Sequence, residues 1–242
     1  MSERYLKEIQ HKSFNIVCLL GRAPAAEQGC DFYTDDFSFH VEEKYGRTPG
    51  EICSSTFYNN RPQEFYSFYR DNILRRRGEP DEVNFTLKRM EDDGRLKGII
   101  TRGFFDLSHR AGCRDVIHLY GNIDSNTCPH CGKVFGADYI LTHTPLPYCD
   151  RCGMLIHPGI ALSGEMLDSQ VMTKAIERIT SAEVLLVLGC SLQSTLGSMA
   201  HYFNGEKICL VNRVSDYSDQ AADCVCIGDI GKILRTAYPP RE

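Results

Sequence analysis

Two closely spaced pairs of cysteines carry the clearest chemical signal in this sequence of 242 residues. The motifs Cys-Pro-His-Cys and Cys-Asp-Arg-Cys are separated by 17 residues, and a glycine follows each of them, Gly132 and Gly153. Glycine allows the chain to turn tightly, so that backbone amides can face the sulfur atoms. Four thiolates at this spacing predict a tetrahedral site for a structural zinc ion, because protein ligands fill all four positions. The predicted ligands are Cys128, Cys131, Cys149 and Cys152.

Two reduced cysteine pairs without a metal are the alternative interpretation of these motifs. His130 and His143 lie nearby in the sequence, but we do not expect them to be ligands, because four cysteines complete the site. The chain has 12 cysteines, and those outside the motifs are scattered, several of them in apolar segments. Such cysteines behave as small buried hydrophobic residues, and we expect no disulfide framework.

A glycine at the end of an apolar segment is a second chemical signal, typical of phosphate binding. In Leu19–Gly29 (LLGRAPAAEQG) the apolar run ends at Gly21, and Pro24 suits the first position of a helix. Nucleotide phosphates bind at such turns, because backbone N–H groups and the helix dipole favour negative charge. Arg22 and Ala23 stand where small residues would let the backbone approach a ligand, so an ordinary strand-to-helix turn is the alternative.

Two further apolar segments end in a similar way. VLGCSLQS (187–194) places Gly189 and Ser191 just after its apolar run, and CLVNR ends its apolar run at Asn212. In open α/β sheets, ligands bind beyond the carboxyl ends of the strands. Since all three segments end at that edge, we predict a nucleotide site there.

Short apolar strands alternate with helices along the chain. The predicted strands cover 15–21, 96–103, 115–121, 183–190 and 207–212, with a last short strand before a closing helix in 226–238. Helices are predicted at 61–77, 82–94 and 167–180, the last with Asp168 as its N-cap. This alternation predicts an α/β fold with a doubly wound parallel sheet.

Two segments interrupt the alternation. Residues 32–77 are helical and aromatic without a strand, and residues 121–155 contain the cysteine pairs. We expect both to be inserts that together form a smaller domain on the main sheet. The nucleotide-binding domain then comprises 1–31, 78–120 and 156–242.

The composition excludes several classes of protein. Hydrophobic residues make up 42% of the chain and charged residues 24%, as in ordinary soluble domains. The net charge of −5 provides no basic field for nucleic acid or acidic membranes. No apolar run reaches the roughly 18 residues that span a bilayer, and the N-terminus lacks a signal-peptide core. We expect a cytoplasmic protein with neither a nucleic-acid nor a membrane partner.

Taken in order, these motifs resemble the sirtuin family of NAD-dependent protein deacylases over nearly the whole chain. The resemblance rests on ITRGFFDLSHRAG, VIHLYGN, the cysteine pairs, HPGIALSGE, VLLVLGCSLQ, CLVNR and CIGDIG. It implies a Rossmann-type domain, a small zinc domain, and a cleft between them where NAD meets an acylated lysine of a protein or peptide. In that family the acyl oxygen attacks the ribose carbon, nicotinamide leaves, and a histidine then acts as general base.

The resemblance also implies where ligands bind. The implied cofactor-binding residues, for NAD or an ADP-ribose-like nucleotide, are Gly21, Arg22, Ala23, Arg102, Gly189, Ser191, Asn212 and Gly228. The implied substrate-binding residues are Ile160, Ala161, Ser163, Gly164 and Glu165.

Several positions depart from the family pattern. Tyr120 stands where the family has its catalytic histidine, and tyrosine, with an ordinary pKa of about 10, is no general base near neutral pH. Arg102, Gly103 and Phe105 stand where the family has glutamine, asparagine and aspartate, and Ser163 replaces an aromatic residue. We therefore expect the deacylase reaction to be weakened or diverged.

His118 is one candidate for a substitute base. It precedes Tyr120 by two positions, and side chains two residues apart on a strand share a face. The alternative is a histidine that is solvent-facing or hydrogen-bonded near the end of a strand. His109, displaced by one position from a histidine of the family pattern, has a similar claim.

Three functional hypotheses follow from these observations. The first is a diverged enzyme that uses NAD for deacylation or ADP-ribosyl transfer. The second is a non-catalytic sensor or scaffold that holds the nucleotide without turnover. The third is a zinc protein whose cleft is blocked, because Arg22, Phe32 and Phe105 are larger than the residues they replace.

Overall fold

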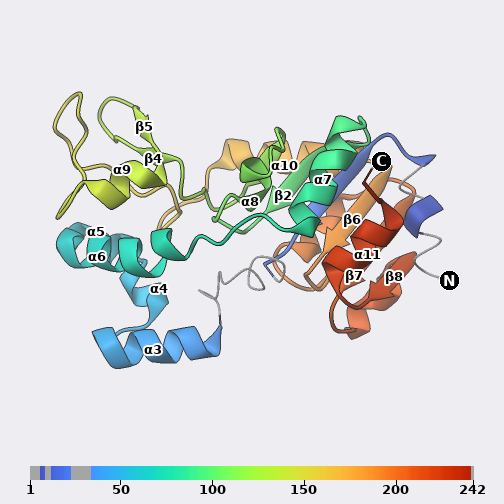
Figure 1. Ribbon diagram of the computed structural model, residues 1–242, viewed down its shortest axis with the longest axis horizontal. Coiled ribbons are helices and arrows are strands. Elements are labelled where there is room, and N and C mark those ends of the chain that lie inside the picture. Colours follow the sequence, from blue (N-terminus) through green and yellow to red (C-terminus); the bar gives the residue numbers. More distant parts are fainter. Residues whose placement is uncertain (1–5, 9–11, 23–33, 241–242) are drawn as a thin grey trace.

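The computed structural model describes residues 6–8, 12–22 and 34–240 and shows a sheet lobe beside a smaller lobe (Figure 1). Six parallel strands of the described residues form one sheet, in the order β3-β2-β1-β6-β7-β8. This is the strand order of a Rossmann-type doubly wound sheet, which confirms the predicted fold class. The strands are β1 (Ile16–Leu20), β2 (Leu96–Thr101), β3 (Val116–His118), β6 (Val184–Leu188), β7 (Lys207–Asn212) and β8 (Cys224–Ile227).

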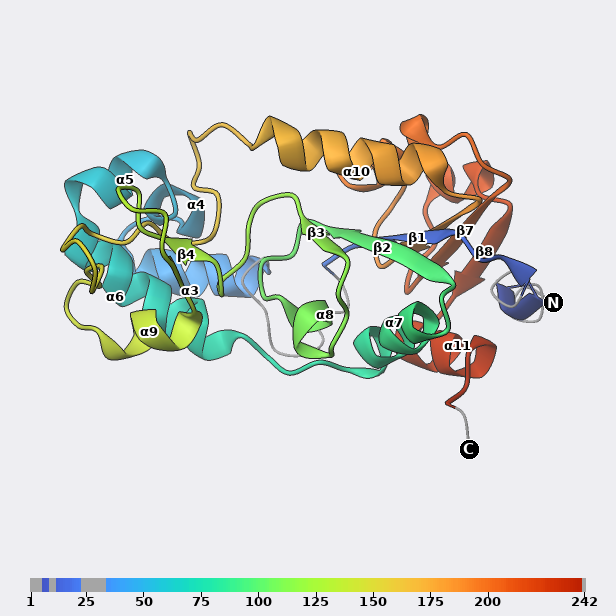
Figure 2. The same cartoon turned by 90° about the horizontal axis from the view of Figure 1, so that it is seen from above.

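Both faces of the sheet are covered by helices (Figure 2). α7 (Glu82–Asp92) and α11 (Ile230–Ala237) cover one face, and α10 (Ser169–Ser181) and η2 (Gly197–Tyr202) cover the other. Every residue of β1 and β6 is buried, as expected of strands covered on both sides. No helix in the described part of the chain is long and apolar enough to cross a membrane.

Local signals explain where several elements begin and end. The Asp168 side chain accepts a hydrogen bond of 2.8 Å from the Gln170 amide, which confirms the predicted cap of α10. The strand predicted over 115–121 ends early, at His118, because the chain turns there: the Gly121 amide donates to the His118 carbonyl at 3.3 Å. Shorter elements connect the main ones: α8 (Leu107–Arg110) and η3 (Tyr217–Ala221).

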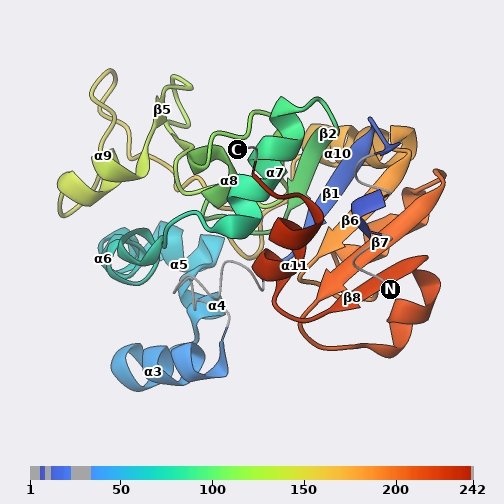
Figure 3. The same cartoon turned by 45° about the vertical axis from the view of Figure 1, so that its right-hand side comes forward.

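The smaller lobe is built from both predicted inserts (Figure 3). One hydrophobic cluster joins the aromatic face of α6, with Phe65, Tyr66, Phe68 and Tyr69 fully buried, to residues around the cysteine pairs. The shared core supports one lobe rather than two, while the domain boundaries stay a prediction. Its elements are α3 (Asp35–Tyr45), α4 (Pro49–Ile52), α5 (Ser55–Asn60), α6 (Pro62–Asn72), η1 (Leu74–Arg76), β4 (Asn126–Thr127), β5 (Val134–Phe135) and α9 (Ala137–Thr142).

A buried arginine holds the two inserts together. The Arg70 guanidinium of α6 donates to the carbonyls of Ile140 at 2.7 Å, His143 at 2.6 Å and Pro145 at 3.0 Å. Arg70 is only 5% exposed, and it supplies donors to carbonyl oxygens that the end of a helix leaves without intrahelical partners. The arginine therefore ends α9 and fixes it against α6.

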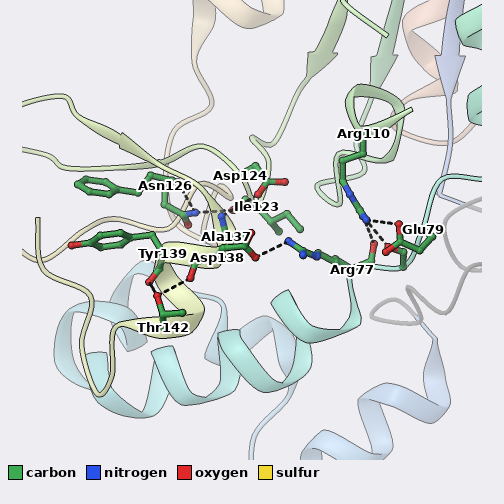
Figure 4. A network of polar contacts seen from close by, with 12 residues as sticks. Arg77, Glu79, Arg110, Ile123, Asp124, Asn126, Ala137, Asp138, Tyr139 and Thr142 are labelled. Atoms are coloured by element: carbon green, nitrogen blue, oxygen red, sulfur yellow. Dashed lines mark hydrogen bonds and ion pairs between the residues drawn. The ribbon is translucent and has the colours of Figure 1, made fainter. Parts of the chain in front are cut away.

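A network of polar contacts connects the smaller lobe to the sheet lobe (Figure 4). Arg110 of α8 donates to the Gly78 carbonyl at 2.8 Å and pairs with Glu79 at 2.7 Å, where the chain leaves the smaller lobe. Arg77 pairs with Asp138 of α9 at 3.3 Å. These contacts fix the segment that passes from one lobe to the other.

Replacing Arg70 with methionine should lower the free energy of unfolding by about 2–4 kcal/mol, because buried carbonyl oxygens would lose their charged donors. Urea unfolding measures this loss. Arg75→Met is the matched control: Arg75 is exposed and pairs with Asp71 at 3.7 Å, and its loss should cost less than about 0.5 kcal/mol. Similar losses in both variants would contradict the role of Arg70.

Candidate functional site

The site begins at the carboxyl ends of β1 and β6, between which the order of the strands reverses. Gly21 follows β1 and Gly189 follows β6, and the Gly21 amide donates to the Leu188 carbonyl at 2.7 Å. A Cβ atom at Gly21 would lie 2.3 Å from the Gly189 carbonyl oxygen, so only glycine fits. Ligands of doubly wound sheets bind at this switch point.

Three other predicted nucleotide-binding residues lie at the same edge. Ser191 follows β6 and its hydroxyl lies 3.1 Å from that of Ser218. Asn212 ends β7, and its carbonyl accepts the Gly228 amide at 2.9 Å just after β8. The structure thus gathers Gly189, Ser191, Asn212 and Gly228 along one edge. Predicted residues Ala23, Pro24 and Phe32 lie outside the described residues.

A cleft of about 620 Å³ opens beside this edge, between the two lobes. Arg22, Arg102 and Tyr120 line it from the sheet lobe, and the Arg102 guanidinium carbon lies 4.7 Å from the centre of the Tyr120 ring. At that distance the cation is attracted by the π face of the phenol. All five predicted substrate-binding residues also line the cleft: Ile160, Ala161, Ser163, Gly164 and Glu165.

The segment 160–165 is held by backbone hydrogen bonds to both lobes. The Ala161 amide donates to the Tyr120 carbonyl at 2.8 Å, and the Ser163 amide donates to the Cys53 carbonyl at 2.8 Å. The Ser55 amide returns a bond to the Ser163 carbonyl at 3.0 Å. One wall of the cleft is therefore an extended backbone whose position depends on the relative placement of the two lobes.

The side chain of Glu165 closes the end of this segment. One of its oxygens accepts the Leu162 amide at 2.8 Å, and the other lies 2.8 Å from His157 Nε2. The His157 ring also packs edge-on against Tyr58, with 5.2 Å between ring centres. His157 and the Leu162 amide thus hold the Glu165 carboxylate, and these contacts fix the end of the cleft wall.

A second, much smaller cavity of about 30 Å³ lies behind Gly21 and contains His118. His118 Nδ1 lies 2.8 Å from the Gly103 carbonyl oxygen, and its Nε2 lies 2.8 Å from Asp106 Oδ1. His109 Nδ1 lies 2.7 Å from the same carboxylate oxygen. Burial opposes ionisation of Asp106, but the hydrogen bonds from His109 and His118 lower its pKa to about 2, and the bond to Asp106 raises the pKa of His109.

His118 and Tyr120 line different cavities. The strand ends at His118, so the alternation on which the shared face was predicted stops before Tyr120. Both ring nitrogens of His118 already face oxygen acceptors, and neither is directed at the cleft. His118 as a substitute base stays a prediction, and this geometry gives it no support.

The carboxylate in the small cavity belongs to Asp106, a residue that the sequence pattern did not indicate as part of the site. Phe105, at the position of the family's aspartate, is 2% exposed and belongs to the hydrophobic core of the smaller lobe. Asp106 has a φ of 55°, a left-handed conformation that aspartate tolerates better than most residues. Asn84 and Ser108, hydrogen-bonded at 3.0 Å, also line the small cavity and carried no signal in the sequence.

The four predicted metal ligands are brought together in the smaller lobe. Their sulfur atoms all lie within 4.8 Å of one another, with 3.3 Å between Cys128 and Cys152 and 3.6 Å between Cys131 and Cys149. Four thiolates bound to zinc at about 2.3 Å would be roughly 3.8 Å apart, so the cluster fits a zinc ion. His143 instead stacks on Tyr139, with 3.7 Å between ring centres.

One cysteine of the cluster has a stabilised thiolate. Burial opposes ionisation of Cys128, but hydrogen bonds from the backbone N–H groups of Cys131 and His130 lower its pKa to about 6. Despite backbone donors at Lys133 and Met154, burial and hydrogen bonds shared among the sulfur atoms instead raise the pKa of Cys131 and raise that of Cys152 to about 12. An ion pair between Lys133 and Asp150, at 2.7 Å, connects the two motifs. Backbone donors and a nearby cation are the usual ways to stabilise sulfur anions.

Residues 31–195 match the model of the Sir2 family. A curated relative, the NAD-dependent protein deacetylase of Clostridium acetobutylicum, is 32% identical over 234 residues, which cover 96% of each chain. A solved structure concerned with sirtuin substrate affinity superimposes with a TM-score of 0.85 at 25% identity, covering 98% of both chains. A Sir2 mutant with tyrosine in place of a histidine, solved with a p53 peptide and NAD, has a TM-score of 0.75 at 26% identity and covers 98% of this chain and 97% of its own.

Replacing Gly21 with alanine should lower the free energy of unfolding by about 3 kcal/mol, because the new Cβ would force β1 and β6 apart. Thermal or urea unfolding measures the loss. Gly50→Ala is the control: Gly50 also lines the cleft, but the nearest atom to its added Cβ is 4.0 Å away. A Gly21 variant as stable as the Gly50 variant would contradict the close approach of the two strands.

Proposed function

This chain belongs to the Sir2 family, and on that basis we propose that it binds NAD or an ADP-ribose-like nucleotide and that its reaction with acylated lysine is weakened. The observation that carries the proposal is the edge formed by Gly21 and Gly189, which adjoins a cleft of about 620 Å³. The edge supplies bare backbone for phosphates, and the cleft supplies room for an acyl-lysine side chain.

The nucleotide side of the site supports binding. Gly21 and Gly189 leave no side chain between a diphosphate and the strand ends, and Arg22 brings a positive charge to the adjoining cleft. Ser191 and Asn212 add polar groups along the same edge. In this proposal the relatives' cofactor, NAD, binds with its ADP-ribose part across β1 and β6.

The acyl side supports recognition of an extended peptide. Backbone between Ile160 and Glu165 forms one wall, tied to Tyr120 and Cys53. Peptides commonly bind by lying alongside an extended segment that lines a cleft. An acylated lysine of a protein or peptide is therefore the proposed substrate, entering the cleft toward Tyr120 and Arg102.

Tyr120 is the reason for a weakened reaction. NAD, when bound, supplies the ADP-ribosyl group that the acyl oxygen attacks. The later proton transfer needs a base in the cleft, and a phenol packed against the Arg102 guanidinium is poorly suited to accept a proton. The Sir2 mutant with a tyrosine in place of a histidine was solved with both NAD and a peptide, so such a replacement is compatible with binding in that protein.

A nucleotide sensor or scaffold is the second candidate function. It is favoured by the combination of glycines at the ends of β1 and β6 with a Tyr120 that offers no base and a His118 whose ring nitrogens both face oxygen acceptors. The two candidates make the same prediction for nucleotide binding. They differ in whether any deacylated peptide is formed.

We also propose that the four clustered cysteines bind a structural zinc ion. Backbone hydrogen bonds connect the cysteine insert to the segment that leads into the cleft wall. Thr127, one residue before Cys128, exchanges two such bonds with His157, of 3.0 and 2.8 Å. Zinc there would fix the insert that supports residues 156–165. Its role would be to hold the cleft wall rather than to take part in the reaction.

Calorimetric titration should show that the protein binds NAD and ADP-ribose, while acyl-peptide is deacylated slowly or not at all. Tyr120→His should raise deacylated-peptide formation, by up to the 10²–10⁴-fold that a general base typically contributes. Tyr120→Phe keeps the ring beneath Arg102 and should give no gain. Absence of binding of either nucleotide, or equal gains in both variants, would contradict the proposal.

Exchanging Cys149 and Cys152 for serine should remove one equivalent of zinc per chain and lower the melting temperature, because the smaller lobe would lose its metal. Elemental analysis and thermal unfolding report the two effects. Cys190→Ser is the control, since Cys190 is half-buried and far from the cluster in sequence, and it should retain the zinc. A double variant that keeps its zinc would rule out the cysteine site.

A further inference from the structure

Two histidines and an aspartate form a second cluster of metal-ligand side chains, apart from the cysteines and from the cleft. His118 Nε2 and His109 Nδ1 lie 2.8 and 2.7 Å from the same oxygen, Asp106 Oδ1. All three atoms lie within 4.8 Å of one another. The proposed function uses none of these residues.

The His118 ring is oriented by a backbone group on its other side. The Gly103 carbonyl lies 2.8 Å from His118 Nδ1, so this nitrogen must carry a proton to make the hydrogen bond. A neutral His118 ring then has a lone pair on Nε2, and its hydrogen bond to Asp106 requires a further proton there. A lone pair and a carboxylate that converge at one point repel each other unless a proton or a metal cation lies between them.

We propose that His118 Nε2, His109 Nδ1 and Asp106 Oδ1 bind a divalent transition-metal ion. Two imidazoles and one carboxylate suit Zn²⁺, Fe²⁺ or Ni²⁺, whereas Mg²⁺ and Ca²⁺ prefer oxygen ligands. With metal–ligand bonds of about 2.0–2.1 Å, neighbouring ligand atoms lie roughly 2.9–3.4 Å apart, a few tenths of an ångström more than here. The bond from His118 Nδ1 to a backbone carbonyl is the usual way in which a metal-binding histidine is oriented.

Burial fixes the geometry of these ligands. The side chains of His118 and Asp106 are 6% and 9% exposed, and that of His109 is 36% exposed. Asp106 begins α8 in a left-handed conformation, which directs its carboxylate at both histidines. A metal would enter from the side of His109, the most exposed of the three ligands.

Two of the three ligands, His118 and Asp106, also line the small cavity, so an open coordination position would face it. Its volume of about 30 Å³ is close to that of one water molecule, and Asn84, Thr101 and Ser108 supply polar groups to its lining. Gly21 also lines this cavity, so the position opens toward the turn proposed to bind phosphates. Three protein ligands and one open position are typical of a metal that binds water or an anionic oxygen, in contrast to the closed cysteine cluster.

Metal analysis of the full chain, loaded with Zn²⁺ and then dialysed, tests this site. The wild type should hold two equivalents of zinc, and Asp106→Asn should hold one. Loading with Co²⁺ separates the sites, because only the cysteine cluster gives thiolate-to-cobalt charge-transfer absorption, which Asp106→Asn should leave unchanged. One equivalent in the wild type, or two in the variant, would overturn the proposal.

Two further variants keep the test decisive if Asp106→Asn folds poorly. His109→Gln changes the most exposed ligand, and we expect it to weaken Zn²⁺ binding at this site at least about tenfold. His143→Gln changes a histidine outside the cluster and should retain both metals. Nitrogen NMR of the histidine rings distinguishes the proton alternative: two imidazolium signals from His118 and His109 that excess Zn²⁺ does not shift would overturn the metal site.

Discussion

The close approach of two backbones at the carboxyl ends of β1 and β6 is the constraint on which the rest of the site depends. Gly21 and Gly189 meet where the strand order reverses, and a single methyl group at Gly21 would collide with the Gly189 carbonyl. The register of the parallel strands then determines which residues of neighbouring strands lie beside Gly21. Thr101 of β2 pairs with Leu20 of β1, so Arg102 and Gly103 emerge beside Gly21. The nucleotide edge, the cleft and the small cavity all share this one boundary.

The cleft exists only because the smaller lobe is fixed against this boundary. The segment 160–165 hydrogen-bonds to Tyr120 on one side and Cys53 on the other. Arg70 and the aromatic face of α6 join the helical insert to the cysteine insert, and Arg110 fixes the connection back to the sheet. Stability in the smaller lobe therefore determines the geometry of the proposed acyl site, and Ile160, a proposed substrate-binding residue, belongs to its core.

Two residues of one short stretch, His118 and Tyr120, have separate surroundings. The turn between them directs His118 to Asp106 in the small cavity, while Tyr120 packs beneath Arg102 in the cleft. The proposed metal site and the proposed nucleotide site would then be neighbours across Gly21, each with its own ligands.

The sequence by itself determined the strands of the sheet, the four clustered cysteines and the glycines that end β1 and β6. These features depend on local periodicity and short spacing, which a linear pattern contains. Only the tertiary structure decided that the Asp106 carboxylate meets His109 and His118, that Cys53 lines the cleft, and that His118 and Tyr120 separate. Each of these depends on a backbone angle or on contacts between residues far apart in the chain. Asp106 has a left-handed φ and its carboxylate lies beside two histidines, and no alternation of residue types records such an angle.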